Sequence, residues 1–236
     1  IKCGAGRRVA LEGNLCNISP QRRSMHNQFY TDLLPSPGGH KLELERHRDF
    51  LRGLGIEAPG LQPAVWMKQE DEAFADRLFG ENGLDPARTI ALFAGAQYDC
   101  RVYEGYGQAM SEFCRANRLT VIALGTEQDR DINQRNLDAI GVRTINLSGG
   151  TTVLQSCAII KRCRLAVGAE TGLAHISCAV GTPNVILLGG GHFGRFMPYS
   201  PLTSVACLPL ECFGCNWSCR YGSSHCVKDV ATELVA

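Results

Sequence analysis

In the second half of the chain, hydrophobic residues fall into short continuous runs that alternate with helix-like patterns, starting at about Leu84. Continuously apolar runs are typical of strands buried on both faces of a parallel sheet. Their alternation with helices indicates right-handed βαβ units. The sequence therefore predicts an α/β fold, with a Rossmann-like parallel sheet and helices on both of its faces. The predicted strands cover residues 89–95, 120–126, 143–149, 165–170 and 184–190, and the predicted helices cover residues 106–118, 134–140, 152–163 and 172–180.

The N-terminal part has a different pattern. It contains one amphipathic helix, from about Lys41 to Leu54, which Gly55 ends. A strand-like segment, a polar segment and a Pro/Gly turn precede the helix. We interpret residues 1–75 as the remnant of an N-terminal domain with a helix and a linker, and residues 76–236 as the Rossmann-like domain. An irregular N-terminal extension of a single domain remains the alternative. Because the sequence begins at Ile1 with a strand-like pattern, we expect a piece of a longer protein.

Charge and hydropathy argue against several classes of partner. The 24 lysines and arginines nearly balance the 23 acidic residues, so there is no overall field to hold a nucleic acid or an anionic membrane. No apolar run approaches the roughly 20 residues that span a bilayer, and the first residues lack the apolar core of a secretion signal. We predict a cytoplasmic globular protein with no membrane span and no nucleic-acid partner.

Small and polar residues follow four of the predicted strands. Ligands of open α/β sheets bind at this edge, because helix N-termini there offer free N–H groups and a positive dipole end. One such turn is weak evidence, since βα turns also use glycine for geometry and threonine for capping. The four turns leave Gly95, then Gly125 to Glu127, then Gly149 to Thr152, and then Glu170 to Gly172 at one predicted crevice.

The last of these turns carries the most chemistry. Thr171 and the amides after it suit a diphosphate, and Glu170 can accept hydrogen bonds from sugar hydroxyls. His175 follows on the same side, one helical turn further on. A core histidine bonded to a neighbouring carbonyl is the alternative interpretation of His175.

The stretch VGAETGLAHISCAVGTPNVILLGG, residues 167–190, resembles the signature of the family 9 glycosyltransferases, the ADP-heptose:lipopolysaccharide heptosyltransferases. That signature is a strand, Asp-Thr-Gly-Leu/Met-x-His, a helix, and Gly-Thr-Pro-x-Val-x-Leu-x-Gly. The resemblance covers about Leu84 to Gly190 in strand order, and residues 1–60 more loosely. It implies a GT-B fold, in which two Rossmann-like domains face each other across a cleft, with this chain supplying the C-terminal half that binds the donor.

The resemblance also implies a set of site residues. Arg101, in the first βα loop, would neutralise the charge of the donor phosphates, which suits its fork of donors. Either Glu127 or Asp129 matches the family's acidic position near the nucleoside, and Thr151 would lie beside the base. The full set of implied donor residues is Gly95, Arg101, Glu127, Thr151, Glu170, Thr171, Gly172, Leu173 and His175.

Two departures from the family pattern bear on function. Glu170 stands where the family has aspartate, and the family's catalytic carboxylate lies in the N-terminal domain, so the catalytic residue of this chain is unknown. The implied function is transfer of a heptose or related sugar from a nucleotide-diphosphate sugar, such as ADP-heptose, to a glycan or protein acceptor. A non-catalytic nucleotide-sugar-binding or scaffold module is the alternative, and a homo-oligomer stays open. A dehydrogenase is disfavoured, because no G-x-G-x-x-G follows the first strand.

The chain contains 12 cysteines, nine of which fall into two groups. Cys114, Cys157, Cys163 and Cys178 lie in helix-like apolar patterns and are predicted to be small buried residues. Five others, from Cys207 to Cys226, crowd into a C-terminal finger at about residues 207–226, where the spacing lets four thiolates surround a tetrahedral metal ion, iron or zinc. Reduced thiols or disulfides are the alternative. The finger resembles the four-cysteine iron finger of the autotransporter heptosyltransferases. The predicted ligands are Cys212, Cys215, Cys219 and Cys226, with Cys207 and His225 as substitutes.

Overall fold

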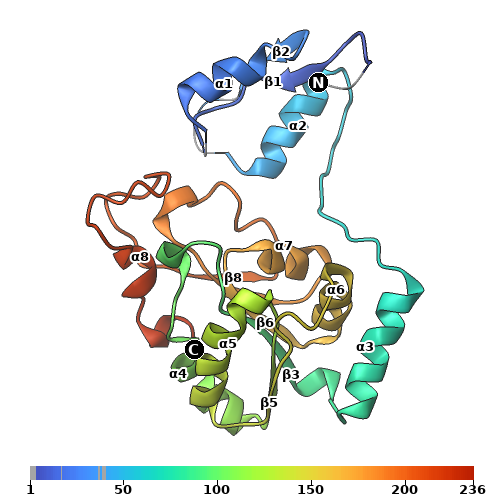
Figure 1. Cartoon of the computed structure of the whole chain (residues 1–236), viewed down its shortest axis with the longest axis vertical. Helices are drawn as coiled ribbons and strands as arrows, with labels where there is room; N and C mark the ends of the chain where they lie inside the picture. Colours follow the sequence, from blue (N-terminus) through green and yellow to red (C-terminus); the bar gives the residue numbers. More distant parts are fainter. Residues whose placement is uncertain (1–3, 17, 37, 39–40) are drawn as a thin grey trace. The chain divides into compact units, whose positions relative to one another are not determined.

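The computed structural model describes residues 4–16, 18–36, 38 and 41–236, and the chain divides into two compact units (Figure 1). The first unit comprises Ile1–Gln62 with Gly194–Phe196, and the second comprises Pro63–Phe193 and Met197–Ala236. The expected boundary after residue 75 falls inside helix α3 (Gln69–Glu81), which belongs to the second unit because it packs against α6 (Val153–Arg162).

The first unit is a small βαβ arrangement with a further helix. Its two strands pair in parallel, with Val9 opposite Asp32. The predicted amphipathic helix is present as α2, and Gly55 follows it in a left-handed conformation at φ 76°. Helix α1 was not predicted, although Ser19 caps it by accepting a hydrogen bond from the amide of Arg22 at 3.3 Å. Residues 37, 39 and 40 of the predicted Pro/Gly turn lie outside the described residues. The elements are β1 (Val9–Leu11), α1 (Pro20–Asn27), β2 (Asp32–Leu34) and α2 (Glu43–Gly53).

The second unit contains a six-stranded sheet, in the order β5-β4-β3-β6-β7-β8, with every pair of neighbours parallel. This confirms the predicted Rossmann-like class. All five residues of β3 are buried, as expected for a strand covered on both faces. The strands are β3 (Thr89–Phe93), β4 (Thr120–Ala123), β5 (Thr144–Asn146), β6 (Leu165–Ala169), β7 (Asn184–Leu187) and β8 (Thr203–Ala206).

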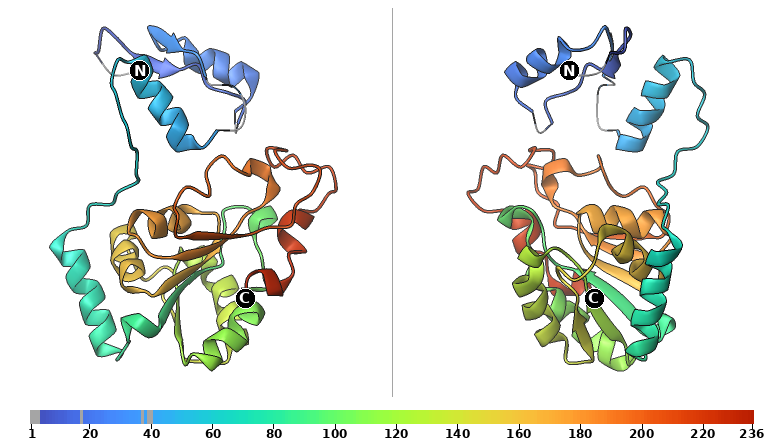
Figure 2. Two further views of the ribbon diagram at one scale, coloured as in Figure 1. Left: turned by 180° about the vertical axis from the view of Figure 1, so that it is seen from behind. Right: turned by 45° about the vertical axis from the view of Figure 1, so that its right-hand side comes forward.

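Helices cover both faces of this sheet (Figure 2). Helices α4 and α5 pack together on one face, where the C-terminal helix α8 also lies, and α3, α6 and α7 cover the other. The remaining bounds are α4 (Tyr106–Ala116), α5 (Arg130–Ile140), α7 (Gly172–Ala179) and α8 (His225–Lys228).

The strand order reverses direction between β3 and β6. The chain runs outward from β3 through β4 to β5, and then returns through α6 to place β6 on the other side of β3. The loop after β3 leads to α4 on one face of the sheet, and the loop after β6 leads to α7 on the other face. The two loops therefore separate and leave a crevice at the carboxyl ends of β3 and β6. Ligands of doubly wound folds bind at such a switch point.

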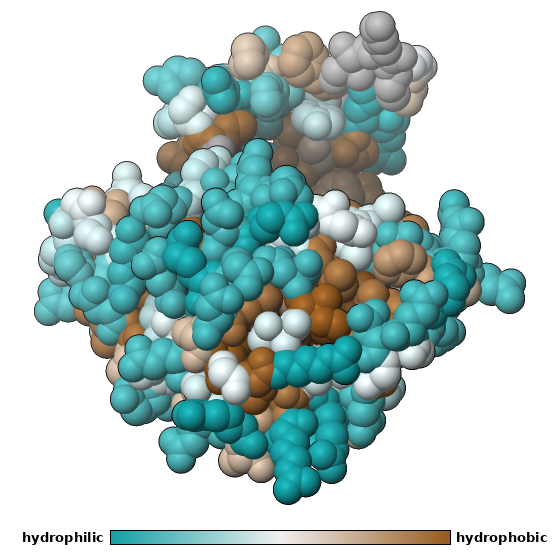
Figure 3. All heavy atoms as spheres, turned by 60° about the horizontal axis from the view of Figure 1, so that its bottom comes forward, coloured by the Kyte–Doolittle hydropathy of each residue, from teal (hydrophilic) through white to brown (hydrophobic). Residues whose placement is uncertain are grey.

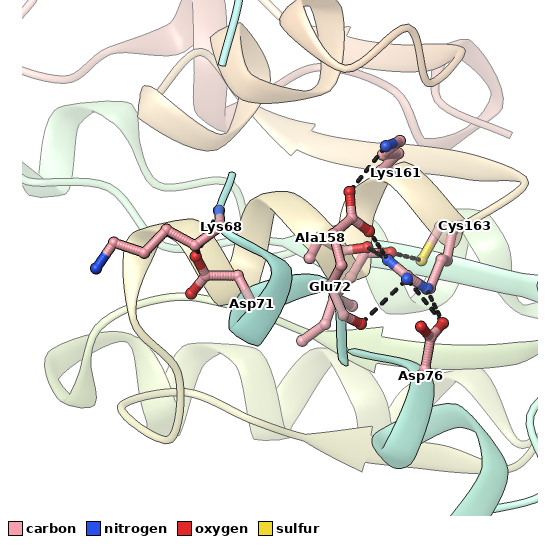
Figure 4. Close-up of polar contacts among 9 residues, drawn as sticks. Lys68, Asp71, Glu72, Asp76, Ala158, Lys161 and Cys163 are labelled. Atoms are coloured by element: carbon pink, nitrogen blue, oxygen red, sulfur yellow. Dashed lines mark hydrogen bonds and ion pairs between the residues drawn. The ribbon is translucent and has the colours of Figure 1, made fainter. Parts of the chain in front are cut away.

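A cluster of ion pairs fastens α3 to α6 and therefore to the sheet (Figure 4). The guanidinium of Arg162 lies 2.6 Å from a carboxylate oxygen of Glu72 and 2.7 Å from one of Asp76. Lys161 adds a contact of 2.8 Å to Glu72. We call these contacts the α3–α6 ion pairs. The Arg162 and Glu72 side chains are mostly shielded from solvent, which reduces screening by salt.

The core of the second unit lies between the sheet and its helices. Its largest fully buried side chains include Tyr106, Phe93 and Leu92. Cys114, Cys157 and Cys163 are buried free thiols as predicted, whereas Cys178 is only half-buried. Hydrophilic side chains cover most of the face in Figure 3, with smaller hydrophobic areas between them. None of the helices in the described part of the chain has both the length and the apolar character needed to cross a bilayer.

Candidate functional site

A cavity of ≈ 510 Å³ lies at the carboxyl ends of β3, β4 and β6. Four segments far apart in the sequence line it, within residues 93–97, 124–129, 149–156 and 171–176. These are the four βα turns that the sequence indicated. Five of the predicted donor residues line the cavity, namely Gly95, Thr151, Thr171, Gly172 and Leu173.

The start of α7 forms one wall of the cavity. Thr171 is in an extended conformation, and the helix begins at Gly172 directly after the last residues of β6. The first amides of a helix have no partner inside it and carry the positive end of its dipole. A methyl group built on Gly172 would have no atom within 4 Å, and Thr171, Gly172 and Leu173 line the cavity, so the start of the helix borders open space. This wall can accept the oxygens of an anion.

Asp129 lines the cavity from the turn after β4. Its Oδ2 accepts hydrogen bonds from the amide of Thr126 at 2.7 Å and from the hydroxyl of Thr126 at 2.8 Å. Its carboxylate lies so close to Gly95 that any Cβ there would collide with it. Gly95 is therefore needed for clearance, and the acidic group at the cavity is Asp129.

Glu127, which the resemblance implied as a donor residue, does not line the cavity. It forms an ion pair with Arg130 at 2.6 Å, and the hydrogen bond from Arg130 lowers the pKa of its carboxyl group. Gln97, Gln128 and Ser156 line the cavity and were missed. All three lie in or just after the βα turns that the sequence singled out, so the position of each turn was the signal that could have found them.

Arg101 and Glu170 lie together beside a second, much smaller cavity of ≈ 10 Å³, which Trp217 also lines. The centre of the Arg101 guanidinium is 4.4 Å from the centroid of the Trp217 ring, within range of a cation–π contact. The Nε of Arg101 is buried and has no hydrogen-bond partner among the described residues. Burial raises the pKa of Glu170 to about 7, although the nearby positive charge of Arg101 opposes this rise.

His175 lies outside both cavities. Its Nδ1 is 3.0 Å from the hydroxyl oxygen of Tyr199, and the two rings are stacked with their centroids 5.7 Å apart. Burial lowers the pKa of His175, which favours the neutral imidazole. In this arrangement the partner of His175 is a tyrosine.

Burial raises the pKa of Cys226, and Cys212, Cys215 and Cys219 each add a smaller rise. Cys226 accepts a hydrogen bond from the amide of Gly190 at 3.3 Å. Over residues 4–16, 18–36, 38 and 41–236, however, no three His, Cys, Asp or Glu side chains are arranged to hold a metal ion. The described sulfur positions do not form a ligand set, and the metal site stays a prediction.

The sequence model of glycosyltransferase family 9 (heptosyltransferase) matches residues 21–222. The chain belongs to this family. The match spans all four turns around the cavity and most of the cysteine finger. No curated protein matches the sequence.

Solved structures of glycosyltransferases share the fold. A family 9 glycosyltransferase from Veillonella parvula matches with a TM-score of 0.67 and 19% identity, over 77% of this chain and 53% of that one. The ADP-heptose lipopolysaccharide heptosyltransferase II of E. coli matches with a TM-score of 0.60 and 20% identity, over 77% and 54%. An E. coli heptosyltransferase solved with ADP matches with a TM-score of 0.57 and 16% identity, over 77% and 54%. The chain thus spans about half the length of the solved structures that it matches.

Proposed function

We propose that this chain binds a nucleotide-diphosphate sugar in the cavity at the switch point and supplies the donor site of a GT-B glycosyltransferase. The observation that carries the proposal is the open cavity at the start of α7, in a chain of glycosyltransferase family 9. Its volume lies within the range of ordinary small-molecule sites. ADP-heptose or a similar compound is the proposed donor, since an E. coli relative of the same fold was solved with ADP.

The polarity of the cavity suggests how the donor would lie. The amides at the start of α7 would face the diphosphate, because that end of the helix attracts negative charge. Asp129 and Thr151 line the cavity from the turns after β4 and β5, where Asp129 could accept hydrogen bonds from the nucleoside and Thr151 could donate or accept them. Glu170 and Arg101 would flank the diphosphate and the sugar from the side of the smaller cavity.

Transfer of the sugar breaks the bond between its anomeric carbon and the diphosphate, and negative charge grows on the leaving oxygen. Groups that stabilise this charge lower the barrier without any covalent step. The α7 amides and the Arg101 guanidinium are suited to this task. Activation of the acceptor hydroxyl requires a base, and we assign none among the described residues. The acceptor, a glycan or a protein, and a cytoplasmic location remain predictions.

Calorimetric titration tests the proposal. The chain is titrated with ADP-heptose, ADP, UDP and GDP. We expect saturable binding of at least one of them with a stoichiometry of about one, because the proposed donor site is a single cavity. Folded protein that binds none of these ligands would contradict the donor site. The longer protein that contains this sequence is then assayed for sugar transfer. Nucleotide-sugar binding without transfer to any acceptor would favour the non-catalytic module.

The structural iron or zinc of the finger is tested separately by elemental analysis of purified protein. The expected result is one metal ion per chain, held by Cys212, Cys215, Cys219 and Cys226, which falls when Cys212 or Cys215 is replaced by serine. Folded protein without iron or zinc would end this prediction. No part of the proposed donor chemistry depends on that metal.

A further inference from the structure

The cysteine finger contacts the donor side of the molecule through one aromatic ring. Trp217 lies between Cys215 and Cys219, yet its ring is the face on which Arg101 rests, at 4.4 Å from the guanidinium centre. A second aromatic ring, that of Tyr98, is farther away, at 5.9 Å. The Trp217 ring therefore provides the closer of the two aromatic faces for the cation.

The backbone holds Trp217 in an uncommon conformation. Asn216 and Trp217 have φ values of 52° and 63°, in the left-handed region that non-glycine residues rarely occupy. Two consecutive residues of this kind cost free energy, and such strain persists only where surrounding contacts enforce it. The strained backbone places the Trp217 indole against the Arg101 guanidinium. This contact offers a functional reason for the strain.

Several contacts enforce this position. The amide of Asn216 donates to the carbonyl of Gly191 at 3.0 Å, and the indole Nε1 donates to Nδ1 of His192 at 3.1 Å. Nε2 of His192 in turn lies 2.8 Å from the side-chain oxygen of Asn216. The ring packs against the loop that follows β7, where a Cβ on either Gly189 or Gly191 would collide with it. The indole is thus fixed both by hydrogen bonds and by shape.

Arg101 has little else to hold it. Its Nε is buried without a hydrogen-bond partner in the described part of the chain, and the nearby Glu170 is partly protonated near neutral pH because burial raises its pKa to about 7. The orientation of the guanidinium therefore depends mainly on the aromatic face beneath it. A guanidinium fixed in this way keeps its remaining donors available for an anion.

We propose that Trp217 is a positioning residue that holds Arg101 for the donor diphosphate, so that the cysteine finger acts on the donor site through this ring. The inference rests on the proposed function, since it requires a diphosphate beside Arg101. It assigns a role to a finger residue that is not a predicted metal ligand. It also explains why the finger and the glycine loop at residues 189–191 are packed so closely.

Binding of ADP and of adenosine to the full chain tests this assignment. Loss of the aromatic face in Trp217→Leu should weaken ADP binding by about fivefold, the value of one cation–π contact. Trp217→Phe keeps an aromatic face and should weaken ADP binding by no more than about twofold. Adenosine lacks phosphate, so its affinity should be the same in all three proteins. Tyr98→Leu is the matched comparison and should weaken ADP binding less than Trp217→Leu does, because its ring is farther from Arg101.

A double-mutant cycle separates positioning from general damage to the fold. In an Arg101→Ala background, Trp217→Leu should cause no further loss of ADP affinity, because the group that it positions is gone. An equal loss in both backgrounds, or an equal loss for adenosine, would overturn the proposal. Failure of the unaltered chain to bind any nucleotide would overturn the proposed function and this inference together. Normal ADP binding by folded Trp217→Leu would overturn the inference alone.

A spectroscopic measurement serves if Trp217→Leu does not fold. Of the two tryptophans, Trp66 is 85% exposed and can be replaced by phenylalanine, which leaves Trp217 as the sole reporter. We expect the Trp217 emission to change when the ADP phosphates place negative charge beside the guanidinium that rests on its ring, and to stay constant with adenosine. Constant emission at saturating ADP would contradict the proposal.

Discussion

The buried carboxyl group of Glu170 gives the chain a measurable dependence of stability on pH. Its pKa is raised from 4.5 to about 7, mainly because burial disfavours the charged form. The folded chain therefore holds this proton more tightly than the unfolded chain does. Well below pH 4.5 the carboxyl group is protonated in both the folded and the unfolded chain, so it does not lower the free energy of unfolding. As the pH rises toward 7, the unfolded state ionises freely while the folded state cannot, so stability falls.

The substitution Glu170→Gln removes this effect, because the amide has the same shape and does not ionise. At roughly 1.4 kcal/mol per pKa unit, the wild-type chain should lose about 2 to 3 kcal/mol relative to the variant between pH 5 and pH 8. Urea unfolding of both proteins at several pH values, followed by the emission of Trp217 in the Trp66→Phe background, measures the difference. Other titrating groups are shared by the two proteins, so their contributions cancel.

Glu127→Gln is a control of opposite sign. The pKa of Glu127 is lowered by its hydrogen bond to Arg130, so its stabilising contribution is lost only as the pH falls below the ordinary carboxylate range. Its difference curve should be flat between pH 5 and pH 8. If the Glu170→Gln curve is equally flat, the carboxylate is ionised normally in the folded chain and the argument from burial is refuted.

Three further substitutions test the site and the scaffold. Gly172→Ala should weaken ADP binding about tenfold by placing a methyl group in the open space before α7, whereas Gly80→Ala, an equally open helical glycine, should leave binding unchanged in the same titration. Arg162→Ala should lower the free energy of urea unfolding by about 2 kcal/mol, since it removes the two α3–α6 ion pairs that Arg162 makes with Glu72 and Asp76; an unchanged midpoint would show that these two pairs contribute nothing. Gly168→Ala should cost about 3 kcal/mol, because its methyl group would collide with Phe93 inside the sheet, and a stable variant would contradict the packing.

The predicted sheet was confirmed because its signals are local. Each apolar run has the length of a buried strand, and each is followed by glycine or a small polar residue, so run length and flanking residues together locate β3 through β7. The same reasoning missed α1, because its residues are polar and only Ser19 and Pro20 mark its start. The predicted strands also extend past the observed ones into the turns, as at Gly95, since apolar runs do not mark where pairing ends.

The candidate site was predictable where it depends on position in the fold, and not where it depends on contacts between distant side chains. Thr171 and Gly172 could be found because they follow a strand and begin a helix. The contact of Arg101 with Trp217 joins residues more than a hundred positions apart, and no local pattern encodes it. For the same reason the sequence could not choose between Glu127 and Asp129, although only Asp129 lines the cavity.

The reversal of strand order between β3 and β6 has a consequence for a bound ligand. Its four contact segments belong to both halves of the sheet, which are joined in the sequence only by the long return through α6. A bound ligand would therefore connect the two halves of the sheet non-covalently. Amide hydrogens on both sides of β3 should then exchange more slowly together once the crevice is filled, and the two halves should open as one.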